Sequence, residues 1–97
     1  MGMSPEQVSE MEEAQPYILV VDDNEANRDL LRRRLQKQGY AVVVAENGSR
    51  AIELLQTQPF DLVLLDIMMP RMNGYQVLEQ LKANPEWQYI PVLVISA

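Results

Sequence analysis

Cysteine and histidine are both absent from this chain of 97 residues. Without cysteine, neither disulfide bonds nor thiolate metal sites can form, which suits a reducing compartment such as the cytoplasm. Without histidine, any reaction that needs imidazole as a base, a phosphate donor or a metal ligand must take it from another protein. Basic residues are few, and the net charge of −6 disfavours direct nucleic-acid binding, which depends on Lys and Arg beside phosphates.

Long apolar runs are missing as well, and none approaches the roughly 20 residues that a membrane-spanning helix needs. The first 15 residues have neither a basic start nor an apolar segment, so they do not resemble a signal peptide. They contain acidic residues and no basic one: Glu6, Glu10, Glu12 and Glu13. We therefore predict a flexible acidic tail over residues 1–15, with a helical extension or a partner contact as the alternative, and one domain over residues 16–97.

Short apolar runs alternate with helical patterns along that domain. Continuous apolar runs predict buried strands over residues 17–21, 41–45, 62–65 and 92–95. Apolar side chains at helical spacing predict a helix over residues 25–38 and two shorter ones around residues 51–55 and 77–81. Alternating strands and helices imply a parallel sheet with right-handed crossovers. The predicted fold class is α/β, with a doubly wound parallel sheet.

Polar residues follow three of the predicted strands. Asp22 and Asp23 follow the first, Asp66 the third and Ser96 the fourth. The carboxyl ends of parallel strands meet at one edge of the sheet, where α/β folds bind ligands. Three carboxylates held together repel one another, and a hard cation such as Mg²⁺ would relieve the repulsion. A carboxylate nucleophile with Mg²⁺ is a route to an aspartyl phosphate.

Each acidic residue also has an ordinary local explanation. Asp22 and Asp23 precede a helix and could cap it, while Asp66 could be a turn residue at the end of a strand. The coincidence of several strand ends favours a site. Glu46, after the second strand, would lie outside this site if that strand is at the edge of the sheet.

Residues 17–97 resemble a response-regulator receiver domain of two-component signalling, through the segments ILVVDDNEANR, FDLVLLDIMMPRMNGYQVL and IPVLVISA. The resemblance implies a flavodoxin-like fold in which Asp66 is the phosphoacceptor. It also implies that Asp22, Asp23, Asp66 and the backbone carbonyl of Met68 bind Mg²⁺ or Mn²⁺.

Further roles follow from the resemblance alone. Ser96 would bind the phosphoryl group and switch the output, and Pro70 and Gly74 would shape the loop after Asp66. The implied donor is a histidine kinase or a histidine phosphotransfer protein, and the implied receiver of the signal is an output domain or effector. Enzymatic activity would be limited to self-phosphorylation from small donors and autodephosphorylation. No membrane insertion is expected.

The sequence departs from the family pattern of five strands and five helices. It stops after the fourth predicted strand, so we expect the fourth helix, fifth strand and fifth helix to be absent. No residue can be assigned the lysine that ends the fifth strand, because Lys37 and Lys82 both fall on predicted helices. Phosphorylation remains chemically possible, but we expect poor switching. The uncharged segment 91–97 would leave an open strand edge, at which two copies could pair.

Two other functions stay open. Phosphatases or phosphotransferases of the haloacid-dehalogenase type also use an aspartate nucleophile, but they usually place a second aspartate two residues later, where this chain has Met68. The other alternative is a non-switching interaction or dimerisation fragment of a receiver.

Overall fold

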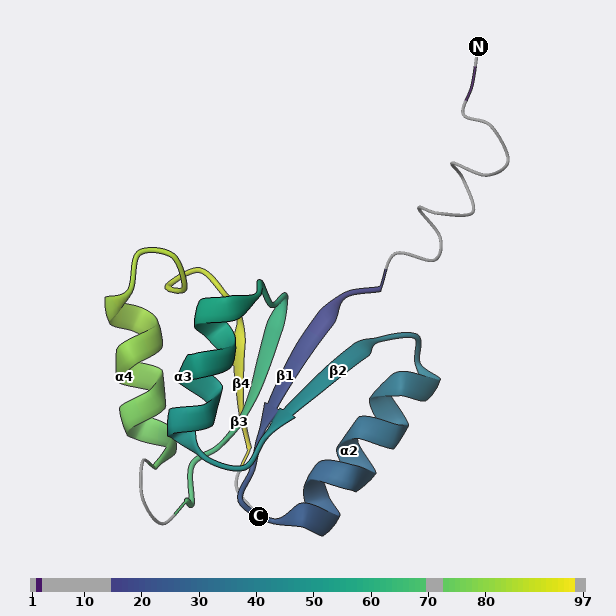
Figure 1. The fold of residues 1–97 in the computed structure, drawn as a ribbon, viewed down its shortest axis with the longest axis horizontal. Helices are drawn as coiled ribbons and strands as arrows, with labels where there is room; N and C mark the ends of the chain where they lie inside the picture. The colour runs from purple at the N-terminus through teal and green to yellow at the C-terminus, as the bar shows by residue number, and fades with distance from the viewer. Residues whose placement is uncertain (1, 3–14, 70–72, 96–97) are drawn as a thin grey trace.

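The structure is a computed structural model that describes residues 2, 15–69 and 73–95. Strands and helices alternate along these residues, as the sequence predicts (Figure 1). In chain order the elements are β1 (Tyr17–Val21), α2 (Glu25–Lys37), β2 (Ala41–Ala45), α3 (Gly48–Thr57), β3 (Leu62–Asp66), α4 (Gly74–Ala83) and β4 (Val92–Ile95). Most of the predicted acidic tail lies outside the described residues, and its flexibility and its boundary remain predictions.

The strands form one parallel sheet in the order β2-β1-β3-β4. Successive strands run level with one another: Val21 of β1 pairs with Ala45 of β2 and with Leu65 of β3, and Asp66 pairs with Ile95 of β4. All carboxyl ends therefore meet at one edge of the sheet. The second strand is at the side of the sheet, as the placement of Glu46 outside the site requires.

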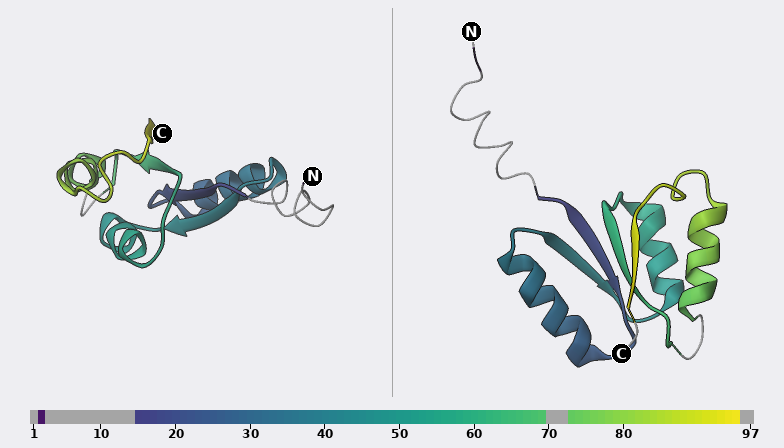
Figure 2. Two further views of the ribbon diagram at one scale, coloured as in Figure 1. Left: turned by 90° about the horizontal axis from the view of Figure 1, so that it is seen from above. Right: turned by 180° about the vertical axis from the view of Figure 1, so that it is seen from behind.

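Helices cover both faces of the sheet, which confirms the doubly wound fold class (Figure 2). Apart from Asp66 at the end of β3, the strands are apolar because alternate side chains of the same strand enter different cores. In β1, Leu19 and Val21 belong to the core under α3 and α4, whereas Ile18 and Val20 belong to the core under α2. No helix among the described residues is both long and apolar enough to cross a membrane.

Asparagine caps the start of each helix. Asn24, Asn47 and Asn73 each accept a hydrogen bond from a backbone N–H three residues later. For α4 the capping is reciprocal, because the Gln76 side chain also accepts a bond from the Asn73 N–H. Gly48 and Gly74 directly follow their capping asparagines and are the first residues of α3 and α4, so Gly74 belongs to a helix start as well as to the end of the loop after Asp66.

Candidate functional site

Asp22 follows β1 and is held at several points. Its side chain is only 2% exposed. Its N–H donates to the carbonyl of Ala45 at 3.1 Å, and its Oδ1 accepts a bond of 2.8 Å from the N–H of Asn24. The Arg28 guanidinium donates from Nη1 to the Asp22 carbonyl, also at 2.8 Å. Since Asn24 caps α2, capping does not explain the Asp22-Asp23 pair.

Asp66 is the last residue of β3 and is 3% exposed. Its Oδ1 accepts a bond of 2.9 Å from the N–H of Met68, so the loop that follows folds back onto the carboxylate. That loop is closed by Gly74, whose N–H donates to the carbonyl of Ile67 at 3.0 Å. Backbone groups beyond the strand thus fix the direction of the Asp66 side chain.

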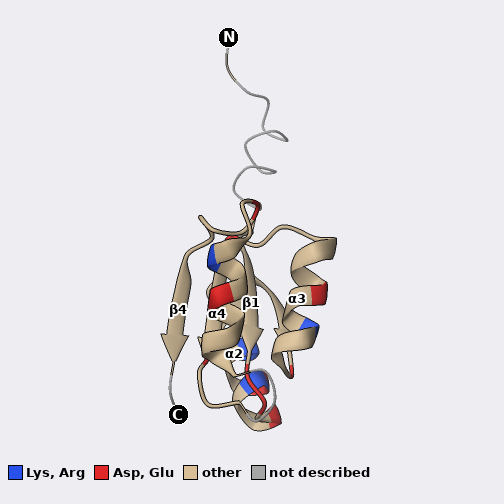
Figure 3. Ribbon diagram, turned by 90° about the vertical axis from the view of Figure 1, so that its left-hand side faces the viewer, with Lys and Arg blue, Asp and Glu red and all other residues tan. Residues whose placement is uncertain are grey.

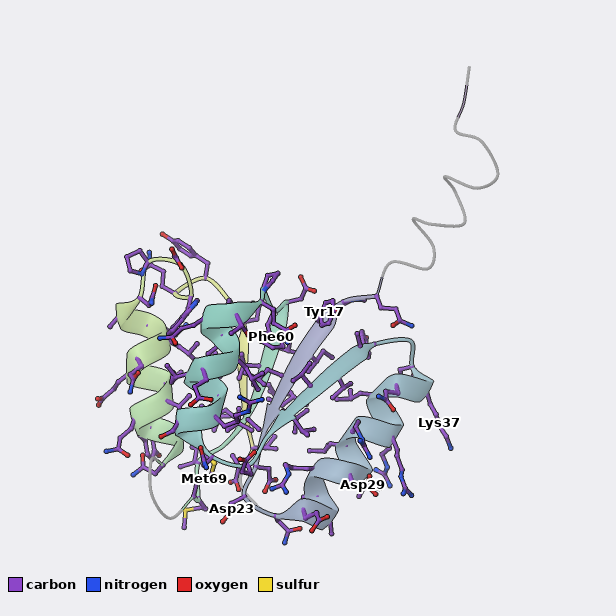
Figure 4. All side chains as sticks on the ribbon, in the orientation of Figure 1. Tyr17, Asp23, Asp29, Lys37, Phe60 and Met69 are labelled. Carbon is purple, nitrogen blue, oxygen red and sulfur yellow. The ribbon has the colours of Figure 1, made fainter. Side chains whose placement is uncertain are left out.

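The three aspartates come together as predicted. One carboxylate oxygen from each of Asp22, Asp23 and Asp66 lies within 4.8 Å of the others. Asp23 is exposed, whereas Asp22 and Asp66 are buried, so the cluster opens to solvent on one side. Figure 4 shows Asp23 and Met69 at this edge of the sheet, with Tyr17 and Phe60 at the opposite edge.

The electrostatics of the cluster favour a cation. Burial is the largest influence on Asp22 and raises its pKa, and the charges of Asp66 and Asp23 raise it further. Hydrogen bonds from the Asn24 N–H and from the Asn27 side chain act in the opposite direction. Oxygens bound to one Mg²⁺ at about 2.1 Å lie at most about 4.2 Å apart, so a small inward movement of the carboxylates suits this ion.

The other predicted residues are placed as follows. The Met68 side chain is 70% exposed, consistent with a role that needs only its backbone. It borders a hollow of ≈ 510 Å³ that is also lined by Asp23, Ile67, Met69, Asn73 and Tyr75. Ser96 and Pro70 lie outside the described residues, so their predicted roles stay predictions. Lys37 and Lys82 both lie on helices, as expected.

Sequence reasoning gave no role to the residues that hold Asp22. Asn24 and Asn27 occur in it only within the segment ILVVDDNEANR, although an asparagine before a helix is a recognisable cap. Arg28 reaches a carbonyl six residues earlier, and no local sequence pattern indicates that contact.

The family model described as the response regulator receiver domain matches residues 18–97. Among curated proteins, the chain is 44% identical over 80 residues to a response regulator MprA of Mycolicibacterium vanbaalenii, covering 82% of this chain and 34% of that protein. It is 43% identical over 83 residues to a probable cyclic di-GMP phosphodiesterase of Vibrio cholerae, covering 86% of this chain and 19% of that protein. The chain thus spans about a third or less of these relatives.

Solved structures agree on the fold. The N-terminal domain of a response regulator receiver protein from Methanoculleus marisnigri has a TM-score of 0.80 at 42% identity, covering 84% of this chain and 66% of that one. The chemotaxis protein CheY4 of Vibrio cholerae has a TM-score of 0.81 at 30% identity, covering 84% of this chain and 68% of that one.

Proposed function

Because this chain belongs to the response regulator receiver domain family, we propose that it is the phosphoacceptor module of a two-component phosphorelay. Asp66 would take its phosphoryl group from a histidine kinase or a histidine phosphotransfer protein. The observation that carries this proposal is the buried Asp66 carboxylate at a strand end, with oxygens of Asp22 and Asp23 within 4.8 Å.

In the proposed transfer, an oxygen of the Asp66 carboxylate attacks the phosphorus of a phosphohistidine. A P–O bond forms, the P–N bond breaks, and the leaving imidazole nitrogen takes up a proton. The Met68 N–H holds Oδ1 and leaves Oδ2 free to react. The donor must supply the imidazole, because this chain has no histidine.

Asp22, Asp23, Asp66 and the Met68 carbonyl would hold Mg²⁺ or Mn²⁺. When bound, the ion neutralises carboxylate and phosphoryl oxygens that would otherwise repel one another. The burial that raises the pKa of Asp22 supports this part of the proposal, because a buried carboxylate in such a cluster needs a counter-charge.

The remaining parts of the proposal concern signalling. Ser96, directly after β4, would bind the phosphoryl group and pass the change to an output domain or effector. We propose no enzymatic activity beyond self-phosphorylation from small donors and autodephosphorylation. The proposed location is the cytoplasm, where a histidine kinase would present its phosphate.

A second candidate function, self-association, is supported by β4. This strand pairs only with β3 among the described strands, and Leu93 and Val94 are 57% and 39% exposed. No charged residue occurs after Glu86 to discourage strand pairing. We propose that two copies pair through this edge.

Acetyl phosphate with Mg²⁺ tests the phosphoacceptor proposal directly by intact mass. The expected result is one added phosphoryl group on the wild-type chain and none on Asp66→Asn. Asp61→Asn is the matched control, because Asp61 precedes β3, is exposed, and uses its carboxylate to accept from the Tyr17 N–H. No adduct on the wild type, or an adduct that survives Asp66→Asn, would leave the non-switching fragment as the better description.

A further inference from the structure

Arg28 lies near acidic residues, but its side chain binds a backbone carbonyl and not a carboxylate. Its Nη1 donates to the backbone carbonyl of Asp22, and it forms no ion pair within the described part of the chain. The neighbouring carboxylate, Asp29, pairs instead with Arg32 and Arg33. In Figure 3, blue basic positions of α2 lie next to the red acidic segment that follows β1.

The carbonyl that Arg28 binds belongs to the peptide unit that joins Asp22 to Asp23. A peptide unit is planar, so fixing its oxygen also fixes the N–H and the Cα of the next residue. The N–H and the carboxylate of Asp22 are already held by Ala45 and Asn24. Asp23, in contrast, is exposed, and no hydrogen bond to its side chain is seen among the described residues. The bond from Arg28 fixes the peptide on the Asp22 side of Asp23, while the bond from the Asn24 N–H to Asp22 Oδ1 holds the other side.

We propose that Arg28 is a positioning residue for the metal site: it orients the Asp22-Asp23 peptide so that both carboxylates face Asp66. This inference rests on the proposed function, because it assumes that the three aspartates bind a divalent cation. It adds to the site a residue that lies on α2 and acts through the backbone.

The direction in which metal affinity changes when Arg28 is replaced distinguishes positioning from simple charge repulsion. A guanidinium beside three carboxylates repels an incoming cation, so by charge alone its removal would tighten metal binding. If Arg28 positions the two aspartates, its removal loosens the site and weakens metal binding. Loss of a residue that orients metal ligands typically lowers affinity by about tenfold to a hundredfold.

The experiment measures Mn²⁺ affinity of the purified 97-residue chain from the free-ion signal in electron paramagnetic resonance. Arg28→Met removes the donor and keeps much of the side-chain length, whereas Arg28→Lys keeps a donor and the charge. Arg32→Met is the matched control, because it removes the same charge one turn further along α2. Urea unfolding of each variant reports stability separately.

We expect Arg28→Met to bind Mn²⁺ about tenfold more weakly than the wild type, with Arg28→Lys within about threefold of it and Arg32→Met unchanged or slightly tighter. Unchanged or tighter binding by Arg28→Met would overturn the inference, as would an equal loss in Arg28→Lys. If Arg28→Met does not fold, Arg28→Gln, whose donor stands on a shorter side chain, is compared with Arg28→Lys. Weaker Mn²⁺ binding by Arg28→Gln alone supports the inference, whereas equal binding by both variants, or an equal loss in both, overturns it. Absence of Mn²⁺ binding by the wild type would instead overturn the proposed metal site, and this inference with it.

Discussion

Burial controls the behaviour of the Asp22 carboxyl group. It is 2% exposed, and loss of surrounding water, reinforced by the charges of Asp66 and Asp23, raises its pKa. The folded chain therefore holds this proton more tightly than the unfolded chain. Stability that comes from the protonated form is fully present below the unfolded pKa and is lost as the pH rises through the folded pKa. At neutral pH and without a metal ion, the Asp22 charge destabilises the fold.

Asp22→Asn should consequently stabilise the metal-free chain at neutral pH. We expect the free energy of unfolding to rise by roughly 1 kcal/mol, the size of a repulsion between like charges that solvent partly screens. Asparagine keeps an oxygen to accept from the Asn24 N–H. The gain should shrink as the pH falls toward 3.8, the ordinary value for this group, because the wild-type residue is then protonated as well.

Urea unfolding in the presence of a chelator measures this difference, with Asp61→Asn as the exposed control. Saturating Mg²⁺ should reverse the order of stability, because the ion stabilises only the chain that binds it. A loss of stability in metal-free Asp22→Asn at neutral pH would show that the Asp22 charge does not destabilise the fold.

At the scale of elements, the junction of β3 and α4 leaves no room for a side chain at Gly74. A Cβ there would lie 2.4 Å from the Cα of Ile67 and 2.6 Å from the carbonyl oxygen of Asp66. Both neighbours are backbone atoms that cannot turn aside. The close approach of α4 therefore fixes the strand end that carries the Asp66 carboxylate.

Gly74→Ala should weaken both the fold and the site. We expect a loss of about 1–3 kcal/mol in the free energy of unfolding, as for other overpacked positions, together with weaker Mn²⁺ binding because Asp66 moves. Gly39→Ala is the control: a Cβ at Gly39 meets nothing within 4 Å, but the residue has a φ of 93°, so alanine there costs about 1–2 kcal/mol through the backbone alone. Equal Mn²⁺ affinities for the two alanine variants would show that Gly74 does not control the site.

The elements also show how far the sequence predicts this structure. The apolar runs predict all four described strands within one residue, because burial on both faces leaves a continuous pattern. The convergence of Asp22, Asp23 and Asp66 follows from parallel topology alone. The sequence places α3 and α4 only around residues 51–55 and 77–81 and does not predict their starts at Gly48 and Gly74, because asparagine followed by glycine suits a turn as well as a helix cap. The tight approach of Gly74 and the reach of Arg28 depend on tertiary packing, which no local pattern records.

At the scale of the whole molecule, the helices cover the sheet unevenly, and β4 is left more exposed than β1 and β3. Leu93 of β4 is the register partner of Leu64, so both side chains point to the face that α2 covers. Leu64 is 6% exposed under that cover, whereas Leu93 is 57% exposed, because α2 packs over β1 and β2. An apolar, uncharged strand that has a neighbour on only one side among the described strands favours pairing between copies.

Light scattering at high micromolar concentration should therefore detect self-association of the wild-type chain. Leu93→Lys should shift it toward monomer, because a charge on an edge strand opposes pairing. Leu30→Lys is the control, since Leu30 is similarly exposed at 48% but lies on α2. A wild-type chain that is cleanly monomeric would refute pairing through β4, and equal effects of the two substitutions would point to general hydrophobicity instead.

Chemical trapping at single-residue resolution identifies which carboxylate receives the phosphoryl group, for which we propose Asp66. Borohydride reduces an aspartyl phosphate to homoserine, which peptide mass spectrometry can locate in the chain. After incubation with acetyl phosphate and Mg²⁺, we predict homoserine at position 66, and none when a chelator replaces the Mg²⁺. Homoserine at Asp22, Asp23 or another carboxylate, or none anywhere in the chain, would show that Asp66 is not the phosphoacceptor.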